Sequence, residues 1–526
     1  MGLPEKSQEV EYIFYMEGKY SMRKKMTSKV MSIALTAAMA LSLAACSSGN
    51  DTSNTPAPAD TTGSSDTATE TAPADTTTEP VADATEPVEE VEPYTVYTDA
   101  DGNPIDLGGM EIVVRDWWTD PEGDSYFRNN PQNEYEEARA EYVDWVEEKY
   151  NFKLVQKAIS DWGSTPADFV DDVTSGGDGT NYVWIVRDSQ EIAQAMATGL
   201  MYDLSKLDCL DFSEEFFTAN KVHEQYTYKG GIYAMYGGLS EPRGGFYINK
   251  QILADANVDI NDIYDAQKNG TWTWDMFLDI LSQVQKDTDN DGTNDIWGVT
   301  GNTGGWGQMF AVSNGGEWVG NSADGYTYRL EDPETIEGMD FALKLLNEYY
   351  MPRPEGANWD YYKEEFLNGT VAFCEDGGMY AGRSDGELAS AQFPVGYVMI
   401  PAGPSGSLVN IASNNPVVLP SYYDDETAWK VAFAWYVWNQ APAGYEDYNP
   451  FVGQARTGIF DERACDETIP MMSEPEHVVI TYSGMIPGIS GAADMGWFPY
   501  PGGDTSAAIE MCAESWKTFI DTANGK

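Results

Sequence analysis

Residues 230–250 read GGIYAMYGGLSEPRGGFYINK, and this stretch decides how the rest of the chain is interpreted. The pattern predicts a short β segment over residues 232–236 and a second one over residues 246–248. Between them, glycines and Pro242 mark a bend where the backbone turns sharply or approaches another segment closely. Taken alone, these residues are also typical of an ordinary β-hairpin, so the surrounding sequence has to decide what the bend connects.

Strands and helices alternate along the chain before this bend. Short apolar runs predict strands, and apolar residues at helical spacing predict helices between them. The predicted strands are 111–115, 152–156 and 182–186, and the predicted helices are 133–150, 167–173 and 191–198. This β-α-β-α-β order predicts an α/β sheet with parallel strands.

The alternation continues after the bend. Thr273 is expected to cap a helix beginning at Trp274, because a threonine hydroxyl can accept a backbone N–H of the first helical turn. Further helices are predicted over 336–350, 361–367, 425–438 and 506–523, and further strands over 370–374 and 395–400.

The composition of the 526 residues excludes one class of function and favours another. A formal net charge of −56, spread along the whole chain, repels a phosphate backbone, so we expect no nucleic-acid partner. The chain also contains 16 Trp and 32 Tyr, which exceeds what packing alone usually requires. Flat aromatic rings stack on the apolar faces of sugars, so this composition is compatible with carbohydrate binding.

Residues 22–45 are predicted to be a lipoprotein signal peptide. Basic residues follow Met22, and the apolar run 30–43 is too short for a membrane span. The run ends in Leu43-Ala-Ala-Cys46, which resembles the lipobox of bacterial lipoproteins, where the cysteine carries the lipid. This places the protein at the cell surface, lipid-anchored to the outer face of the bacterial cytoplasmic membrane, with no other membrane contact.

Two segments flank this signal. Residues 1–21 contain several glutamates and fit no export signal, so they are interpreted as an over-extended start. Residues 46–93 consist almost entirely of Ser, Thr, Ala, Pro, Asp and Glu, and such a segment cannot bury enough apolar surface to fold. We therefore expect a disordered acidic tether, followed by a folded body over residues 94–526.

Several stretches, taken in order, resemble the sugar-type extracellular solute-binding proteins of bacterial ABC importers. The bend 230–250 is similar to the crossover between the two lobes of that family. The other similar stretches are Thr271-Trp-Thr-Trp-Asp275, the acidic loop 287–295 before Trp297-Gly298, Phe366-Leu-Asn-Gly-Thr-Val-Ala-Phe373, residues 395–406 and Val417-Val-Leu-Pro420. The resemblance covers roughly residues 105–526, and it depends on the order of these stretches together with the lipobox.

The resemblance implies a two-lobe periplasmic-binding-protein-like α/β fold, with discontinuous lobes joined by hinge crossovers that close over a ligand. Lobe 1 would comprise about 94–237 and 401–450, and lobe 2 about 245–400 and 451–526. It implies a monomer without an organic cofactor that captures a sugar or oligosaccharide and delivers it to the membrane subunits of an ABC permease.

Candidate ligand-binding residues follow from a general rule for open α/β sheets, in which ligands lie outside the carboxyl ends of the strands. Carboxylates and arginines can bind pairs of sugar hydroxyls, and tryptophans can stack on sugar rings. The selected residues are Trp117, Trp118, Arg187, Asp188, Glu241, Arg243, Trp306, Glu375 with its neighbour Asp376, and Trp497. Each could equally serve the surface or the packing, whereas the set as a whole fits a carbohydrate site.

The segment Asp287-Thr-Asp-Asn-Asp-Gly-Thr-Asn-Asp295 resembles the core of a calcium-binding loop. Carboxylates at positions 1, 3, 5 and 9, a glycine at position 6 and a carbonyl at position 7 suit Ca²⁺. The predicted ligands of this structural ion are Asp287, Asp289, Asp291, Thr293 and Asp295. Position 12 is Gly298 instead of the glutamate of an EF-hand, so a further ligand has to come from elsewhere, and a solvated acidic turn is the alternative.

An enzymatic function has little support in the sequence. The only histidines are His223 and His477, and the metalloprotease, serine-hydrolase and P-loop motifs are all missing. We expect no catalytic residue. Two alternatives remain open: a secreted glycoside hydrolase, which needs only two carboxylates, and a calcium-dependent carbohydrate-binding surface protein. Beyond Cys46, four cysteines could form two disulfides or remain buried thiols.

Overall fold

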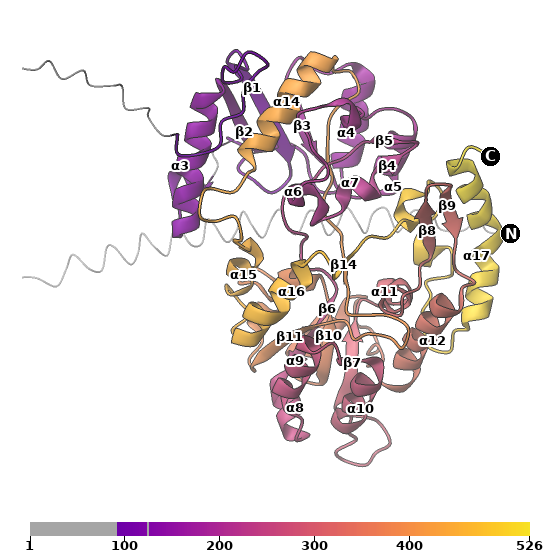
Figure 1. Cartoon of the computed structure of the whole chain (residues 1–526). Coiled ribbons are helices and arrows are strands. Elements are labelled where there is room, and N and C mark those ends of the chain that lie inside the picture. Colours follow the sequence, from indigo (N-terminus) through magenta and orange to yellow (C-terminus); the bar gives the residue numbers. More distant parts are fainter. Residues whose placement is uncertain (1–91, 124–125) are drawn as a thin grey trace, which may run out of the picture. The chain divides into compact units, whose positions relative to one another are not determined.

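The computed structural model describes residues 92–123 and 126–526 of the chain (Figure 1). The predicted over-extended start, signal peptide and lipid-bearing Cys46 lie outside the described residues, as does nearly all of the predicted tether. The folded body contains two four-stranded sheets, each covered by helices, and three short two-stranded ladders.

The first sheet has the strand order β13-β3-β1-β2 and confirms the predicted parallel α/β arrangement. β1 (Met110–Asp116) pairs in parallel with β2 (Phe152–Ala158) and with β3 (Asn181–Ile185). The short strand β13 (Val417–Val418) arrives from a distant part of the sequence and pairs antiparallel with β3. The helices associated with this sheet are α3 (Glu134–Lys149), α4 (Thr165–Ser175), α5 (Gln190–Ala197) and α14 (Asp425–Trp438).

The second sheet has the order β11-β6-β10-β7. β7 (Trp297–Gly301) and β10 (Val371–Glu375) are parallel, and β6 (Gly245–Asn249) runs antiparallel to β10 and to β11 (Val395–Met399). Its helices are α8 (Lys250–Asp255), α9 (Ile260–Lys268), α10 (Trp274–Val284), α11 (Trp306–Ser313), α12 (Pro333–Glu348) and α13 (Tyr361–Leu367). Thr273 caps α10 as predicted, because its side chain accepts the backbone N–H of Met276.

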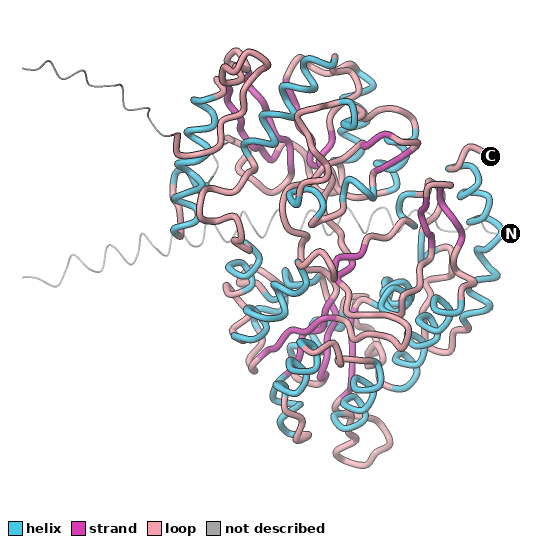
Figure 2. Tube along the Cα trace, viewed as in Figure 1, coloured by secondary structure: helices cyan, strands magenta, loops and turns pink. Residues whose placement is uncertain are grey.

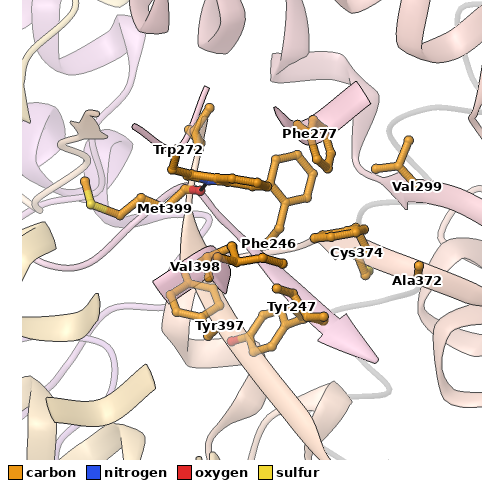
Figure 3. Packing of buried hydrophobic residues seen from close by; sticks show 14 of the residues in the cluster. Phe246, Tyr247, Trp272, Phe277, Val299, Ala372, Cys374, Tyr397, Val398 and Met399 are labelled. Atoms are coloured by element: carbon orange, nitrogen blue, oxygen red, sulfur yellow. Dashed lines mark hydrogen bonds between the residues drawn. The ribbon is translucent and has the colours of Figure 1, made fainter. Parts of the chain in front are cut away.

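The core of this second half is rich in aromatic side chains. Phe246 on β6 packs edge-on against Phe373 of β10, and Phe277 of α10 lies against both rings. The fully buried Trp272 donates its indole N–H to the carbonyl of Met399, 2.9 Å away, so the segment that leads into α10 is held at the end of β11 (Figure 3). The aromatic residues near Trp274 in the sequence therefore serve packing.

The stretch 230–250 is a crossover between the two sheets, and the hairpin alternative is wrong. β5 (Gly231–Ile232) pairs with β4 (Thr227–Tyr228), whereas β6 belongs to the second sheet. The predicted strand 232–236 is shorter than expected: beyond Ile232 only Met235 pairs again, with Val417. A Cβ atom at Gly237 would lie 2.2 Å from the Phe216 ring, so any larger residue would require this ring to move.

One connection between the two halves, residues 439–449, leads from α14 on the first sheet to α15 (Pro450–Ala455) in the second half. Three others run between the two sheets, and we call them the crossing segments: residues 237–244, 412–416 and 474–484. Apart from β14 (Val478–Val479), whose partner is β12 (Asn410–Ile411), they consist of loops, turns and one short 3-10 turn (Figure 2). Asn410, buried beside these segments, accepts the backbone N–H of Arg243 and donates to the carbonyls of Glu241 and Met472. Asn414 accepts the N–H of Glu241 and donates to the Ser240 hydroxyl. Buried amide side chains thus hold the crossing segments side by side.

The last part of the chain packs against both halves, because Ile509 and Trp516 share a buried apolar cluster with Trp184 of the first sheet. The long helix α17 (Thr505–Ala523) lies against α12 and against a hairpin formed by β8 (Val319–Ser322) and β9 (Gly325–Tyr328) (Figure 1). The remaining short helices are α2 (Tyr126–Asn129), α6 (Glu215–Thr218), α7 (Val222–Gln225), α15 (Pro450–Ala455) and α16 (Ile469–Ser473).

Two further findings concern cysteines and membranes. Cys209, Cys374, Cys465 and Cys512 are all free thiols, so the alternative of buried or half-buried thiols holds for these four. Within residues 92–123 and 126–526, none of the helices combines the length and the apolar character that a membrane crossing needs.

Candidate functional site

The carboxyl edge of the first sheet carries exposed tryptophans. Trp117 and Trp118 follow β1 and meet edge to face, with ring centroids 4.8 Å apart. The loop after β2 lies beside these tryptophans, because the carbonyl of Asp116, the last residue of β1, accepts hydrogen bonds from the N–H groups of Ile159 and Ser160. That loop presents Trp162, which is 55% exposed, while Trp118 is 48% exposed. Two large aromatic faces are therefore open to solvent at this edge.

Arg187 and Asp188, after β3, complete this edge with different roles. The guanidinium of Arg187 lies 4.6 Å from the centre of the Trp162 ring, a cation–π contact that orients the tryptophan. Asp188 instead accepts a hydrogen bond of 2.7 Å from the hydroxyl of the buried Tyr226. Burial raises the pKa of the Asp188 carboxyl above its usual range. The Asp188 carboxylate is therefore already hydrogen-bonded within the protein, unlike the exposed tryptophans of this edge.

The crossover bend places an ion pair at the corresponding edge of the second sheet. Arg243 donates twice to one carboxylate oxygen of Glu241, at 2.6 and 3.1 Å. The guanidinium of Arg243 also lies 4.6 Å from the ring centre of Tyr380, and Arg383 lies at the same distance from that ring. Tyr380 and Arg383 were not among the predicted residues. They reach the bend because Gly378, with φ of +61°, lets the loop after β10 pass directly against Pro242 and Arg243.

Glu375, the last residue of β10, is the most perturbed acid at this edge. Burial raises the pKa of its carboxyl to about 7. The indole N–H of Trp306 donates to the Glu375 carboxylate over 3.2 Å. Since Trp306 is completely buried, its ring packs in the core instead of facing a ligand. Its indole N–H orients the Glu375 carboxylate.

The other two predicted residues of this half lie differently. Asp376 is buried, accepts a hydrogen bond of 3.1 Å from the Tyr362 hydroxyl, and has the ammonium of Lys363 3.7 Å away. Trp497 is 66% exposed and precedes α17. Among the described residues, no hydrogen bond or ring contact joins Trp497 to either carboxyl edge, so the structure does not bring it together with the rest.

Both carboxyl edges adjoin the crossing segments. At the first sheet, Val186, directly after β3, donates its N–H to the carbonyl of Pro416, where a crossing segment enters β13. At the second sheet, Phe246 pairs with Glu375 and Gly245 with Met399, where another crossing segment enters β6. The exposed tryptophans of one edge and the charged residues of the other are thus placed beside two different crossing segments, which the hydrogen bond from the Glu241 N–H to Asn414 joins.

The acidic loop before β7 gathers carboxylates at the surface. One carboxylate oxygen from each of Asp287, Asp289 and Asp295 lies within 4.8 Å of the others, which fits the chemistry of a Ca²⁺ site. Asp291, another predicted ligand, accepts the N–H of Thr293 at 2.7 Å, and Gly292 has a φ of +93°, as a turning position requires. Hydrogen bonds from Thr288 hold the pKa of Asp295 below its usual range.

Two surface grooves lie apart from these residues. One, of about 630 Å³, runs between α12 and α17, and the other, of about 620 Å³, runs along α4 beside Arg115. None of the predicted ligand-binding residues lines either groove.

Comparisons with known proteins place the chain in a family. Residues 141–446, more than half of the chain, match the family of bacterial extracellular solute-binding proteins. UspC of M. tuberculosis is similar in structure, with 18% identity and a TM-score of 0.50, covering 79% of this chain and 100% of that one. A cyclic α-maltosyl-1,6-maltose binding protein from Arthrobacter globiformis has 15% identity and a TM-score of 0.51, with coverages of 80% and 98%. At these identities the two likenesses concern the fold, and no curated protein sequence matches. The chain belongs to the bacterial extracellular solute-binding proteins.

Proposed function

We propose that the protein captures a sugar or oligosaccharide between the carboxyl edges of its two sheets and delivers it intact to an ABC permease. The observation that carries this proposal is the placement of exposed tryptophans on one edge and of Glu241, Arg243 and Glu375 on the other, beside crossing segments that are hydrogen-bonded to each other. Aromatic faces suit the apolar side of a sugar ring, and carboxylates and guanidinium groups suit its hydroxyls.

Two facts support a sugar over other solutes and binding over catalysis. The structural neighbour from Arthrobacter globiformis is named as the binding protein of a cyclic maltosyl-maltose. Members of the solute-binding family are binding proteins and not enzymes, so the glycoside-hydrolase alternative is set aside. The family also supports a location outside the cytoplasm, where a lipid on Cys46 would tether a monomeric body to the membrane. The mass of the mature N-terminus measures that modification directly, and an unmodified Cys46 would contradict it.

Thermal unfolding with a panel of soluble mono- and oligosaccharides tests the proposed capture. A sugar at about 100 times its dissociation constant is expected to stabilise the protein by about 2.7 kcal/mol, because it binds the folded state alone. The double variant Trp118→Ala/Trp162→Ala should lose most of this shift, whereas Tyr500→Ala, which removes an exposed aromatic side chain from the loop beside α12, should keep it. If no sugar shifts the transition, the sugar class is wrong, and recovery of cleaved sugar would contradict binding without turnover.

We also propose that the acidic loop 287–295 holds a structural Ca²⁺. With Ca²⁺ at about ten times its dissociation constant, we expect the free energy of unfolding to rise by about 1.4 kcal/mol. The variant Asp287→Asn/Asp289→Asn removes two of the three gathered carboxylates and should abolish the rise. Asp324→Asn, which removes an exposed acid from a different turn, serves as the control. An equal rise in the double variant would place the ion elsewhere.

A further inference from the structure

A second group of metal-ligating side chains lies on the third crossing segment, apart from the acidic loop. Glu474, Glu476 and His477 each offer one ligand atom, and these atoms lie within 4.8 Å of one another. The Nε2 atom of His477 is 3.8 Å from a carboxylate oxygen of Glu474 and 3.9 Å from one of Glu476. His477 directly precedes β14, which Figure 1 shows in the middle of the folded body.

The orientation of the His477 ring is fixed by a hydrogen bond to a residue other than the two glutamates. Its Nδ1 atom lies 3.0 Å from the carbonyl oxygen of Leu408. A carbonyl can only accept, so Nδ1 has to carry the hydrogen, and in the neutral ring the lone pair is then on Nε2. That lone pair is on the ring nitrogen next to both carboxylates. Histidines that bind metals are held in this way, with the second ring nitrogen donating to a carbonyl or a carboxylate.

The backbone around the histidine is also secured. The N–H of His477 donates to the carbonyl of Glu474, and its own carbonyl accepts the N–H of Asn410. The ammonium of Lys221 donates to the next carbonyl, that of Val478, over 2.6 Å. Of the three side chains only the ring is largely buried, with 20% exposed, while Glu474 and Glu476 are 51% and 77% exposed. The imidazole is therefore fixed and the carboxylates are free to adjust.

We propose that Glu474, Glu476 and His477 bind a divalent transition-metal ion such as Zn²⁺. Ligands of a tetrahedral zinc ion are about 3.3 Å apart, so each carboxylate oxygen has to move roughly half an ångström closer to Nε2, and both carboxylates are exposed enough to do so. One imidazole nitrogen and two carboxylates suit Zn²⁺ or Co²⁺, whereas Ca²⁺ prefers oxygen ligands alone. Water can occupy the fourth position, because the site is open to solvent. The bound ion would stiffen the segment whose backbone contacts Asn410.

Titration of the full chain with Co²⁺, followed by its visible absorption, tests this site. The parent is expected to bind one equivalent with the absorption of a four-coordinate ion that has a nitrogen ligand, and Zn²⁺ should displace it. His477→Gln should weaken this binding at least tenfold. Glu476→Gln should weaken it severalfold, and because Glu476 is exposed, this variant leaves the packing unchanged.

The control is Asp287→Asn/Asp289→Asn, which disrupts the other group of carboxylates and should bind Co²⁺ like the parent. The proposal is overturned if His477→Gln and Glu476→Gln titrate like the parent, or if the control variant loses the absorption. It is also overturned if the parent shows no four-coordinate absorption with one equivalent bound.

Discussion

Replacing Asn410 with alanine is expected to lower the free energy of unfolding by about 3–5 kcal/mol, because each polar group left without its partner in a buried place costs about 1–3 kcal/mol. The side chain accepts from the N–H of Arg243 at 2.7 Å and donates to the carbonyls of Glu241 and Met472, each at 2.9 Å. These three backbone groups belong to the crossover bend and to the end of α16. The variant would lose the main side-chain link between two connections of the sheets.

Denaturant unfolding of the parent and of Asn410→Ala measures this loss. Asn358→Ala is the matched control, because this exposed side chain makes no hydrogen bond in the described part of the chain, and its substitution should change stability by less than about 0.5 kcal/mol. If Asn410→Ala behaved like the control, the amide would not hold the crossing segments together.

The largest pH effect is expected at Glu375. Burial raises the pKa of its carboxyl from an ordinary value of 4.5 to about 7 in the folded protein. Between these two values the unfolded chain releases this proton while the folded chain keeps it. The contribution of Glu375 to stability is therefore fully present below pH 4.5 and decreases as the pH rises towards 7. At 1.36 kcal/mol for each pKa unit, the loss is about 3 kcal/mol.

A comparison of Glu375→Gln with the parent isolates this effect from the many other acids. The glutamine cannot ionise, so the variant should gain about 3 kcal/mol relative to the parent between pH 4.5 and pH 8. Glu364→Gln, an exposed substitution on α13, controls for the removal of one negative charge. Parallel stability curves of Glu375→Gln and the parent over this range would show that Glu375 ionises normally in the folded protein.

The strands and helices that were predicted are found in the structure because their signals are local, whereas β7, α8, α9 and α11 were not predicted. The helices over 361–367 and 425–438 have the predicted bounds, and most other ends agree within one or two residues. The strand 232–236 was overestimated, because its apolar residues are buried without continuous pairing. The hairpin β8–β9 was missed, since it is short and half of it is polar and exposed.

Part of the candidate site could be predicted from the general rule on where ligands bind in open α/β sheets. Residues after the strands of a parallel sheet meet at one edge, and that rule selects Trp117, Trp118 and Arg187. The same rule could have found Trp162, four residues after β2. The complete burial of Trp306 could not be predicted, because the rings that cover it, such as those of Phe246 and Tyr350, come from distant parts of the sequence.

Hydrogen–deuterium exchange with and without a sugar that stabilises the protein tests the central claim most directly. If one ligand is held by both carboxyl edges, exchange should slow at residues 117–119 and 187–189 on one sheet and at 241–243 and 375–380 on the other. The groove between α12 and α17 should exchange as before. Protection confined to one edge, or to that groove, would contradict capture between the two sheets.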